Sequence, residues 1–274
     1  MSPDFRNPTP CGQLFIGAHN LHRQSLLKET TNLSSTCPPC MPREGAMISR
    51  EDVNTLAKSS GWLSKQPSEF QEALLSRCNL RRHVAGEIIC NVGDRFTGMF
   101  GLVTGIMKIE FATPGQDLKI ASVKQSNFWF GQASSLTREA HSVTVTVTKP
   151  SSILHISHER FEELMADASY ARCFALLTVE HYYEAATALA HLLSDRTEHR
   201  IASRLALLAE KAGGVTPIEL CVTQNDLAEM CNLSRSVVLQ VLKRLEDRGI
   251  IQTAYRRIQI SDPVSLLAFC SETA

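Results

Sequence analysis

The hydrophobic residues change their spacing along the chain, and each change marks a segment. Over residues 48–80 they recur every three or four positions, as on one face of a helix, with a break near Gly61. The interval then becomes two, and over residues 142–148 three valines alternate strictly with serine and threonine, as in a half-buried strand. Helical spacing returns over residues 159–194. We therefore expect helices, then strands, then helices.

Short strand candidates lie between turn-forming glycines in the middle of the chain. The candidates are residues 87–90, 99–103, 106–111, 118–123 and 142–148. The glycines that mark the turns are Gly86, Gly93, Gly98, Gly101, Gly105, Gly115 and Gly131. Many short strands with regularly spaced turn residues are typical of a jelly-roll-like barrel. The barrel and its flanking helices together make an α+β fold.

The helical segment at residues 166–195 has a second regularity. Apolar or small residues step by 3, 4, 3, 4 and 3 positions, which is the seam along which two helices pack side by side. They are Leu176, Val179, Tyr183, Ala186, Ala190 and Leu193. This seam is too long for one small domain to bury, so we predict a dimerisation helix. The alternative is a helix that simply covers the barrel.

Residues 223–245 have the spacing of a helix-turn-helix. Thr223 and Asp226 form the capping-box signature of a helix start, and the first helix should end near Cys231. Asn232 suits the left-handed backbone of a tight turn, and Ser234 can cap a second helix. The residues expected to pack the two helices together are Leu227, Ala228, Cys231, Leu233, Val238, Val241 and Leu245. A two-helix corner in any bundle shows similar spacing, but here the cap, turn and apolar signals agree.

The second of these helices keeps several polar residues off its packed face. Arg235, Ser236 and Gln240 lie on the turns that enter the major groove in this motif, where Arg can pair with guanine and Gln with adenine. Ser234, Lys243 and Arg244 are better placed for phosphates. We therefore predict three base-reading residues flanked by phosphate contacts.

A hairpin follows the second helix. Two strand-like pieces within residues 250–260 flank a short turn that contains Arg256 and Arg257. This pattern predicts a wing, and its two arginines suit phosphate contacts.

The net charge of the whole chain does not reveal the local excess of basic residues in this region. The 274-residue chain has a formal net charge of zero and a pI near 7.1. Between residues 235 and 257, however, only Glu246 and Asp247 oppose six basic residues, which are Arg235, Lys243, Arg244, Arg248, Arg256 and Arg257. Local rather than total charge therefore indicates nucleic-acid binding.

Cysteine usage and hydropathy indicate a soluble, intracellular protein. No apolar run reaches the roughly 20 residues that span a bilayer, and the first residues lack a signal-peptide core. Nine cysteines are scattered without the density of a disulfide scaffold. We expect six of them to be reduced and buried within elements, namely Cys78, Cys90, Cys173, Cys221, Cys231 and Cys270.

Residues 1–46 differ in composition from the rest. They hold six of the eleven prolines and little periodicity, which predicts a disordered tail. A second interpretation is that the native chain begins at Met47. The tail contains a CxxC pair, Cys37 and Cys40, that can bind zinc or an iron-sulfur cluster or form a redox disulfide. The alternative is a flexible tail without a metal or redox role.

The order of barrel, seam helix and winged helix-turn-helix resembles the Crp/Fnr superfamily of bacterial transcription regulators. The resemblance covers roughly residues 48–270. It rests on the spacing of Gly86, Gly93-Asp94 and Gly105, and on Leu233-Ser234-Arg235 leading into Val237-Val238, Leu242 and Leu245. It implies an α+β fold in which a cyclic-nucleotide-binding-like β-roll sensor (47–165), a dimerisation helix (166–195) and a DNA-binding domain (196–274) follow the tail. It also implies a cytoplasmic homodimer that binds a two-fold related site in double-stranded DNA, and that contacts RNA polymerase if it activates transcription.

The chain departs from the cyclic-nucleotide-binding members at the effector site. Those members open their cassette with Gly-Glu and close it with Arg-Ser or Arg-Thr, whereas Gly131 is followed here by Gln132 and the closing position falls on His141 or Ser142. Arg138 is three residues early, and Ser134 lies between. Without a guanidinium at that place a cyclic phosphate loses its bidentate partner. We therefore do not expect a cyclic nucleotide as the effector, and the sequence leaves open whether the protein needs an effector.

Other effector chemistry seen in the superfamily is only partly matched. Iron-sulfur members use four cysteines, three of them clustered, and the tail offers Cys37 and Cys40 alone in that arrangement. Haem ligands could come from His83, His141, His155 or His158, although a lone histidine in a strand is more often structural. An iron-sulfur cluster, haem and a thiol switch all stay open, and the effector is unassigned.

The reading helix departs as well. Members that read a TGTGA-type half-site carry Glu and Arg where this chain has Ser236 and Gln240, so we expect a different half-site with an A·T preference at Gln240. The function expected is sequence-specific DNA binding. The competing hypothesis is a regulatory protein-binding module whose winged helix does not read DNA. We do not expect an enzyme, because the sequence shows no paired carboxylates, nucleophile elbow or phosphate loop.

Overall fold

Three short helices open the part of the chain that the computed structural model describes, which comprises residues 48–115, 117–213 and 216–272. They are α2 (Arg50–Ser59), α3 (Gly61–Ser64) and α4 (Ser68–Arg77). Ser49 and Asp52 form a capping box that starts α2. Ser60 lies between α2 and α3, and α3 begins at Gly61, whose φ is 74°, which confirms the expected break near Gly61. The expected tail, with Cys37, Cys40 and the alternative start at Met47, lies outside the described residues.

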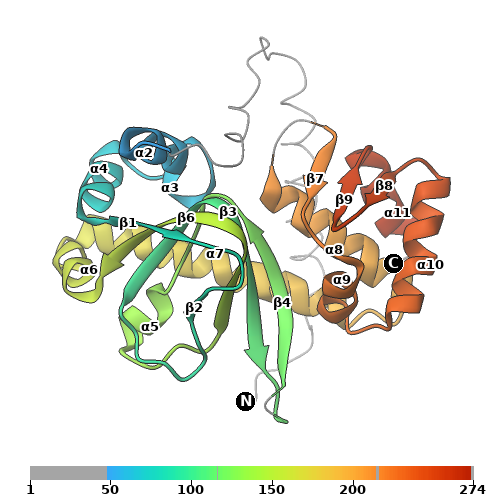
Figure 1. Cartoon of the computed structure of the whole chain (residues 1–274), viewed down its shortest axis with the longest axis horizontal. Helices are drawn as coiled ribbons and strands as arrows, with labels where there is room; N and C mark the ends of the chain where they lie inside the picture. Colours follow the sequence, from blue (N-terminus) through green and yellow to red (C-terminus); the bar gives the residue numbers. More distant parts are fainter. Residues whose placement is uncertain (1–47, 116, 214–215, 273–274) are drawn as a thin grey trace, which may run out of the picture. The chain divides into compact units, whose positions relative to one another are not determined.

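A six-stranded antiparallel sheet follows (Figure 1). Its strands are β1 (Asn79–His83), β2 (Ile88–Cys90), β3 (Gly98–Ala112), β4 (Leu118–Gln125), β5 (Phe128–Phe130) and β6 (Thr144–Ser157). The order is β1-β6-β3-β4, with β2 paired to β6 and β5 paired to β3. The expected β-roll is confirmed. The pattern missed β1 and β5, and the second half of β6.

Two expected strands are in fact one. Residues 99–103 and 106–111 both belong to β3, which bends at Gly105 rather than ending there. Its pairing with β6 shifts register on both sides of Gly105, and Pro150, which cannot donate a ladder hydrogen bond, lies in the matching part of β6. The expectation of a turn was therefore wrong, because the glycine serves a bulge.

The helical segment at 159–194 is also different from the expectation. It forms two helices, α6 (His158–Met165) and α7 (Ala168–Leu192). The side chain of Asp167 accepts hydrogen bonds from the amides of Ser169 and Tyr170, and this cap starts a new helix. The continuous helical spacing could not show the break, because both helices use the same apolar intervals.

Aromatic residues join the first helices to the sheet and to α7. The Trp62 indole donates to the carbonyl of Cys173 at 3.1 Å, and its ring lies 5.6 Å from Phe70 and 5.9 Å from Trp129, both edge to face. The buried face of α7, which includes Phe174, completes this cluster. One side of α7 is therefore fixed to the β-roll.

The last third of the described chain is a winged helix-turn-helix. Its elements are α8 (Thr197–Ala212), β7 (Ile218–Leu220), α9 (Gln224–Met230), α10 (Arg235–Asp247), β8 (Ile251–Ala254), β9 (Arg257–Ile260) and α11 (Pro263–Glu272). The strands form a small sheet in the order β7-β9-β8, which confirms the predicted wing. The pattern did not predict β7 or α11. Within the described residues, no helix has both the length and the apolar content needed to cross a bilayer.

The bend of β3 at Gly105 predicts that alanine is more destabilising there than at Gly86. Gly105 and Gly86 both have a positive φ, 107° and 94°, but a Cβ at Gly105 would lie 2.6 Å from the Cα of Ser151, whereas Gly86 faces open space. Gly86→Ala should cost about 1–2 kcal/mol of unfolding free energy through backbone strain alone. Gly105→Ala should cost about 3 kcal/mol or more, since strain and overlap add. Urea unfolding of both variants measures the difference, and equal losses would contradict it.

Candidate nucleic-acid interface and effector region

The first helix of the motif, α9, starts with the predicted capping box. The Thr223 hydroxyl accepts from the amide of Asp226 at 3.1 Å, and the Asp226 carboxylate accepts from the amide of Thr223 at 2.9 Å. Asp226 is only 4% exposed. The amides of Thr223 and Asp226 at the helix start are therefore both satisfied by local side chains.

The turn between the two helices also follows the prediction. Asn232 has a φ of 50°, and the amide of Leu233 donates to the carbonyl of Ala228 at 2.9 Å. Ser234 then caps α10 by accepting from the amide of Val237. Leu233 is half-buried, while the other expected packing residues are buried, namely Leu227, Ala228, Cys231, Val238, Val241 and Leu245.

The three base-reading candidates lie on the exposed face of α10. Arg235, Ser236 and Gln240 are all exposed, while the opposite side of the helix is buried in the core of the domain. Arg235 lies 3.4 Å from the side-chain oxygen of Gln224 on α9. The sequence offers no signal for this contact, because the geometry of the turn decides which α9 side chain faces Arg235.

The phosphate candidates differ in whether an acidic side chain lies beside them. Lys243 and Arg256 are exposed, and Arg256 sits in the wing turn with a φ of 58°. Arg244 instead forms an ion pair with Glu198 of α8, and Arg257 lies 3.3 Å from Glu219 of β7. The Ser234 hydroxyl is 3.0 Å from that of Ser236. All five lie within the motif or its wing.

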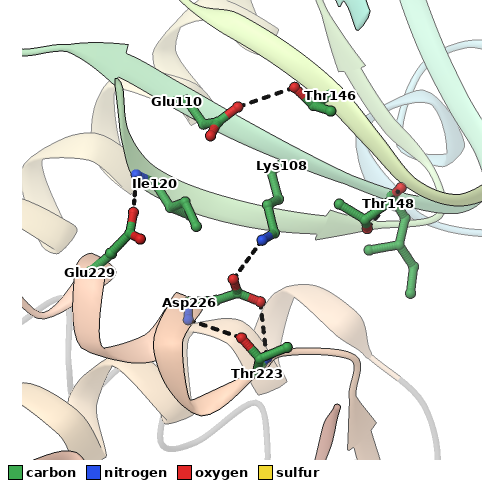
Figure 2. Close-up of polar contacts among 9 residues, drawn as sticks. Lys108, Glu110, Ile120, Thr146, Thr148, Thr223, Asp226 and Glu229 are labelled. Atoms are coloured by element: carbon green, nitrogen blue, oxygen red, sulfur yellow. Dashed lines mark hydrogen bonds and ion pairs between the residues drawn. The ribbon is translucent and has the colours of Figure 1, made fainter. Parts of the chain in front are cut away.

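Two acidic residues of α9 contact the β-roll (Figure 2). The Lys108 ammonium lies 2.5 Å from the carboxylate of Asp226, so this carboxylate both caps α9 and pairs with β3. One turn later, Glu229 accepts from the amide of Ile120 on β4 at 3.3 Å. The sequence offered no signal for these pairs, since their members lie more than 100 positions apart.

Four effector candidates gather at the start of α5 (Gln132–Thr137). Gly131 precedes this helix with a φ of 93°, and Gln132, Ser134 and His141 are all buried. Ser134 lies 3.4 Å from the His141 ring. The Gln132 amide nitrogen lies 2.8 Å from Nδ1 of His181 on α7. A polar path therefore leads from the effector region to the long helix.

The other two effector candidates lie outside this group. Arg138 is exposed and lies 3.5 Å from Glu162 of α6, and Ser142 is exposed. The guanidinium of Arg138 is thus directed to a surface carboxylate and not to the buried side chains of Gln132 and His141.

Burial lowers the pKa of both histidines in this region. Burial, helped by the nearby charge of Lys124, lowers the pKa of His181 to about 4. The pKa of His141 is also lowered by burial, with the Asp94 carboxylate acting in the opposite direction. Both rings are therefore neutral at pH 7. Lys124 itself forms a buried ion pair with Glu184 of α7 beside a cavity of about 70 Å³.

The histidines considered as haem ligands do not converge. His83 pairs with Glu87 at 2.7 Å, His158 lies 3.7 Å from Glu162, and the His155 ring is packed 4.8 Å from that of Phe100. Within residues 48–115, 117–213 and 216–272, no group of three or more His, Cys, Asp or Glu side chains could hold a metal ion. The tail cysteines lie beyond these ranges.

No disulfide joins the cysteines within the described part of the chain, and burial makes several of them poor nucleophiles. Burial raises the pKa of the Cys78, Cys90 and Cys231 thiols to about 12, so they are protonated at pH 7. Cys173 is buried as well, but Cys221 and Cys270 are only partly buried, which corrects the expectation for these two. Both side chains are packed against the core of the domain but stay partly accessible to solvent.

Comparison with known proteins adds an independent line of information. Residues 80–168 match the family model described as a cyclic nucleotide-binding domain, and residues 199–269 match the Crp-like helix-turn-helix domain. The transcriptional activator protein FnrA of Stutzerimonas stutzeri is 22% identical over 188 residues, which is 67% of this chain and 77% of FnrA. The cAMP-activated global transcriptional regulator Vfr of Pseudomonas aeruginosa is 23% identical over 189 residues, or 66% and 88% of the two chains. The structure of FixK2 from Bradyrhizobium japonicum shares the fold, with a TM-score of 0.63 at 16% identity over 70% of this chain and 96% of FixK2.

The buried His181 predicts a pH dependence. Because its pKa is about 4 in the folded chain and about 6.5 when unfolded, the unfolded state binds more protons between these values. Stability should therefore fall as the pH drops through this window, by about 2 kcal/mol between pH 7 and pH 5 from this residue. Urea unfolding of wild type and His181→Asn at both pH values measures the effect. The variant should lose about 2 kcal/mol less than wild type, and equal losses would exclude His181 as the source.

Proposed function

The chain belongs to the Crp/Fnr family of DNA-binding transcriptional regulators, and we propose that it acts in the cytoplasm as a homodimer on a two-fold related DNA site. The observation that supports this best is the exposed face of α10. Its base-reading candidates are free of the protein core, while the cap, turn and wing hold the helix in place. As an activator, such a dimer would also contact RNA polymerase.

The side chains on α10 favour a particular kind of half-site. The guanidinium of Arg235 can donate two hydrogen bonds to guanine, and the amide of Gln240 can pair with adenine. Ser236 is adaptable, since a hydroxyl can donate or accept. Around them, Ser234, Lys243, Arg244, Arg256 and Arg257 are proposed to contact phosphates and set the register.

The exposed side of α7 supports the homodimer. Of the six seam residues, Leu176 and Val179 are each 46% exposed, Tyr183 is 65% exposed and Leu193, just beyond the helix end, is 74% exposed. Ala190 is exposed and Ala186 is half-buried. Tyr182 and Leu189 extend this apolar surface. A second copy of α7 would remove the stripe from water.

The effector region favours a signal other than a cyclic nucleotide. The relative Vfr is named for activation by cAMP, but the arginine nearest the expected phosphate position, Arg138, pairs with Glu162 at the surface. We propose that the buried polar group of Gln132, Ser134 and His141 receives the signal and passes it to α7 through His181. A signal sensed by Cys37 and Cys40 is the other candidate.

Base reading can be tested by selecting bound sequences from a random DNA pool. Wild type should recover a two-fold related site, and Arg235→Ala with Gln240→Ala should reduce specific affinity about 100-fold or more, toward non-specific binding. Lys119→Ala, at an exposed position of β4, should leave the selected sequence unchanged. If the double variant selected the same sequence as wild type, the protein-binding alternative would be favoured.

The seam can be tested by analytical ultracentrifugation. Val179→Asp or Tyr183→Asp places a charge in the proposed interface and should weaken the dimer by about 100-fold or more, since an unpaired buried carboxylate is costly. Phe111→Asp is a matched control, because Phe111 is 50% exposed on β3. Dimers that persist in both seam variants would place the interface elsewhere.

A further inference from the structure

The DNA-binding domain is fastened to the edge of the β-roll, and we infer that this contact fixes the distance between the two half-sites that the dimer reads. The contact joins Lys108, Ile120 and Ala121 of the roll to Asp226, Glu229 and Arg204 of the DNA-binding domain, and is here called the β4 interface. The inference rests on the proposed function, because it requires a homodimer on two half-sites.

Strand β4 has free backbone groups for such a contact. It lies at the end of the strand order and, among the strands that the structure describes, pairs with β3 alone, so its outer edge carries no strand there. The pairing also skips a residue. Ile109 pairs with Ser122 and Glu110 with Ile120, which leaves Ala121 as the extra residue of a bulge.

Side chains of the DNA-binding domain bind both of these positions. Glu229 accepts from the amide of Ile120, and Arg204 of α8 donates to the carbonyl of Ala121 at 2.5 Å. Arg204 is only 6% exposed. A guanidinium is costly to bury, so its hydrogen bond to the bulge makes this part of the interface specific in position.

The ion pair between Lys108 and Asp226 adds a third fixed point (Figure 2). Movement of α9 away from the roll would break this ion pair, which is almost completely buried on the Asp226 side, while Asp226 would still cap α9. The three polar contacts come from two helices, α8 and α9, and therefore restrict rotation as well as separation.

Apolar packing makes the interface continuous with the core of the DNA-binding domain. Ile106, Ile120 and Val123 of the roll are buried in the same cluster as Leu205 of α8 and Leu227 of α9. Buried apolar contact of this kind resists sliding, because close-packed side chains have few alternative arrangements. Without it the short connection between α7 and α8, residues 193–196, could act as a pivot.

The β4 interface leaves the reading face free. Arg235, Ser236 and Gln240 remain exposed while the interface is formed, so the docked domain can read DNA. In a dimer joined through α7, each roll is fixed to the seam and each reading head is fixed to its roll. The separation of the two heads then follows from rigid parts, and half-sites must lie at the matching distance along the duplex.

The test measures affinity for DNA with zero, one or two base pairs added between the selected half-sites. The variants are Lys108→Met and Glu229→Met, which remove the contacts to Asp226 and to the Ile120 amide. Their matched controls are Lys119→Met, at an exposed lysine of β4, and Glu229→Gln, which keeps an oxygen that can accept from the Ile120 amide. Amide hydrogen exchange at Ile120 reports directly whether the contact is lost.

Wild type and both controls should prefer one spacing and lose about 10-fold or more in affinity for each added base pair, since each pair also rotates the second half-site. The two variants should bind the preferred spacing about 10-fold more weakly, and should lose less than about 3-fold on insertion, because freed heads adapt. Binding to a single half-site should be unchanged.

The outcomes separate this inference from the proposed function. The inference would be overturned if both variants showed faster amide exchange at Ile120 but still preferred the same half-site spacing as wild type. The proposed function as a DNA-binding regulator would then still hold. The inference would also be overturned if the wild-type protein selected half-sites that lie at varying distances from each other. Failure of wild type to select any sequence would instead refute the proposed function.

Discussion

The carboxylate of Asp226 holds the helix-turn-helix in two ways at once. It closes the capping box with Thr223 and pairs with Lys108 of the β-roll, although it is almost completely buried. A buried carboxylate is stable only when its oxygens are satisfied, and here an amide and an ammonium satisfy them. The position of α9 sets the turn at Asn232, and the turn sets the direction of α10. This one side chain therefore contributes to the position of α9 and, through the turn, to the direction of α10.

Local features of this region could be predicted because they are encoded within a few residues. The capping box, the turn at the left-handed Asn232 and the cap at Ser234 each join positions no more than five apart, and all are observed. The alternation of apolar and polar residues on α10 likewise follows from one helix and one core. Arg235, Ser236 and Gln240 could thus be placed on the exposed face from the sequence alone.

Long-range features could not be predicted in this way. Nothing near Asp226 in the sequence indicates Lys108, and nothing near Ala121 indicates Arg204. Some residues are compatible with two different local structures, and the sequence pattern predicted the wrong one. A glycine such as Gly105 can end a strand or bend it, and an aspartate such as Asp167 can continue a helix or cap the next one. The surface pairing of Arg138 with Glu162 depends on tertiary structure for the same reason.

The carboxylates beside Arg244 and Arg257, two of the proposed phosphate contacts, have a consequence for target search under the proposed function. Glu198 and Glu219 already neutralise Arg244 and Arg257, so a phosphate must compete with an attached acid for each guanidinium. This competition weakens every encounter with non-target DNA, where base contacts offer nothing in return. A genome presents about 10⁶–10⁹ such competing positions, and time spent on them delays arrival at the promoter. Under the proposed function, the acidic partners Glu198 and Glu219 would therefore shorten the residence of the protein on non-target DNA.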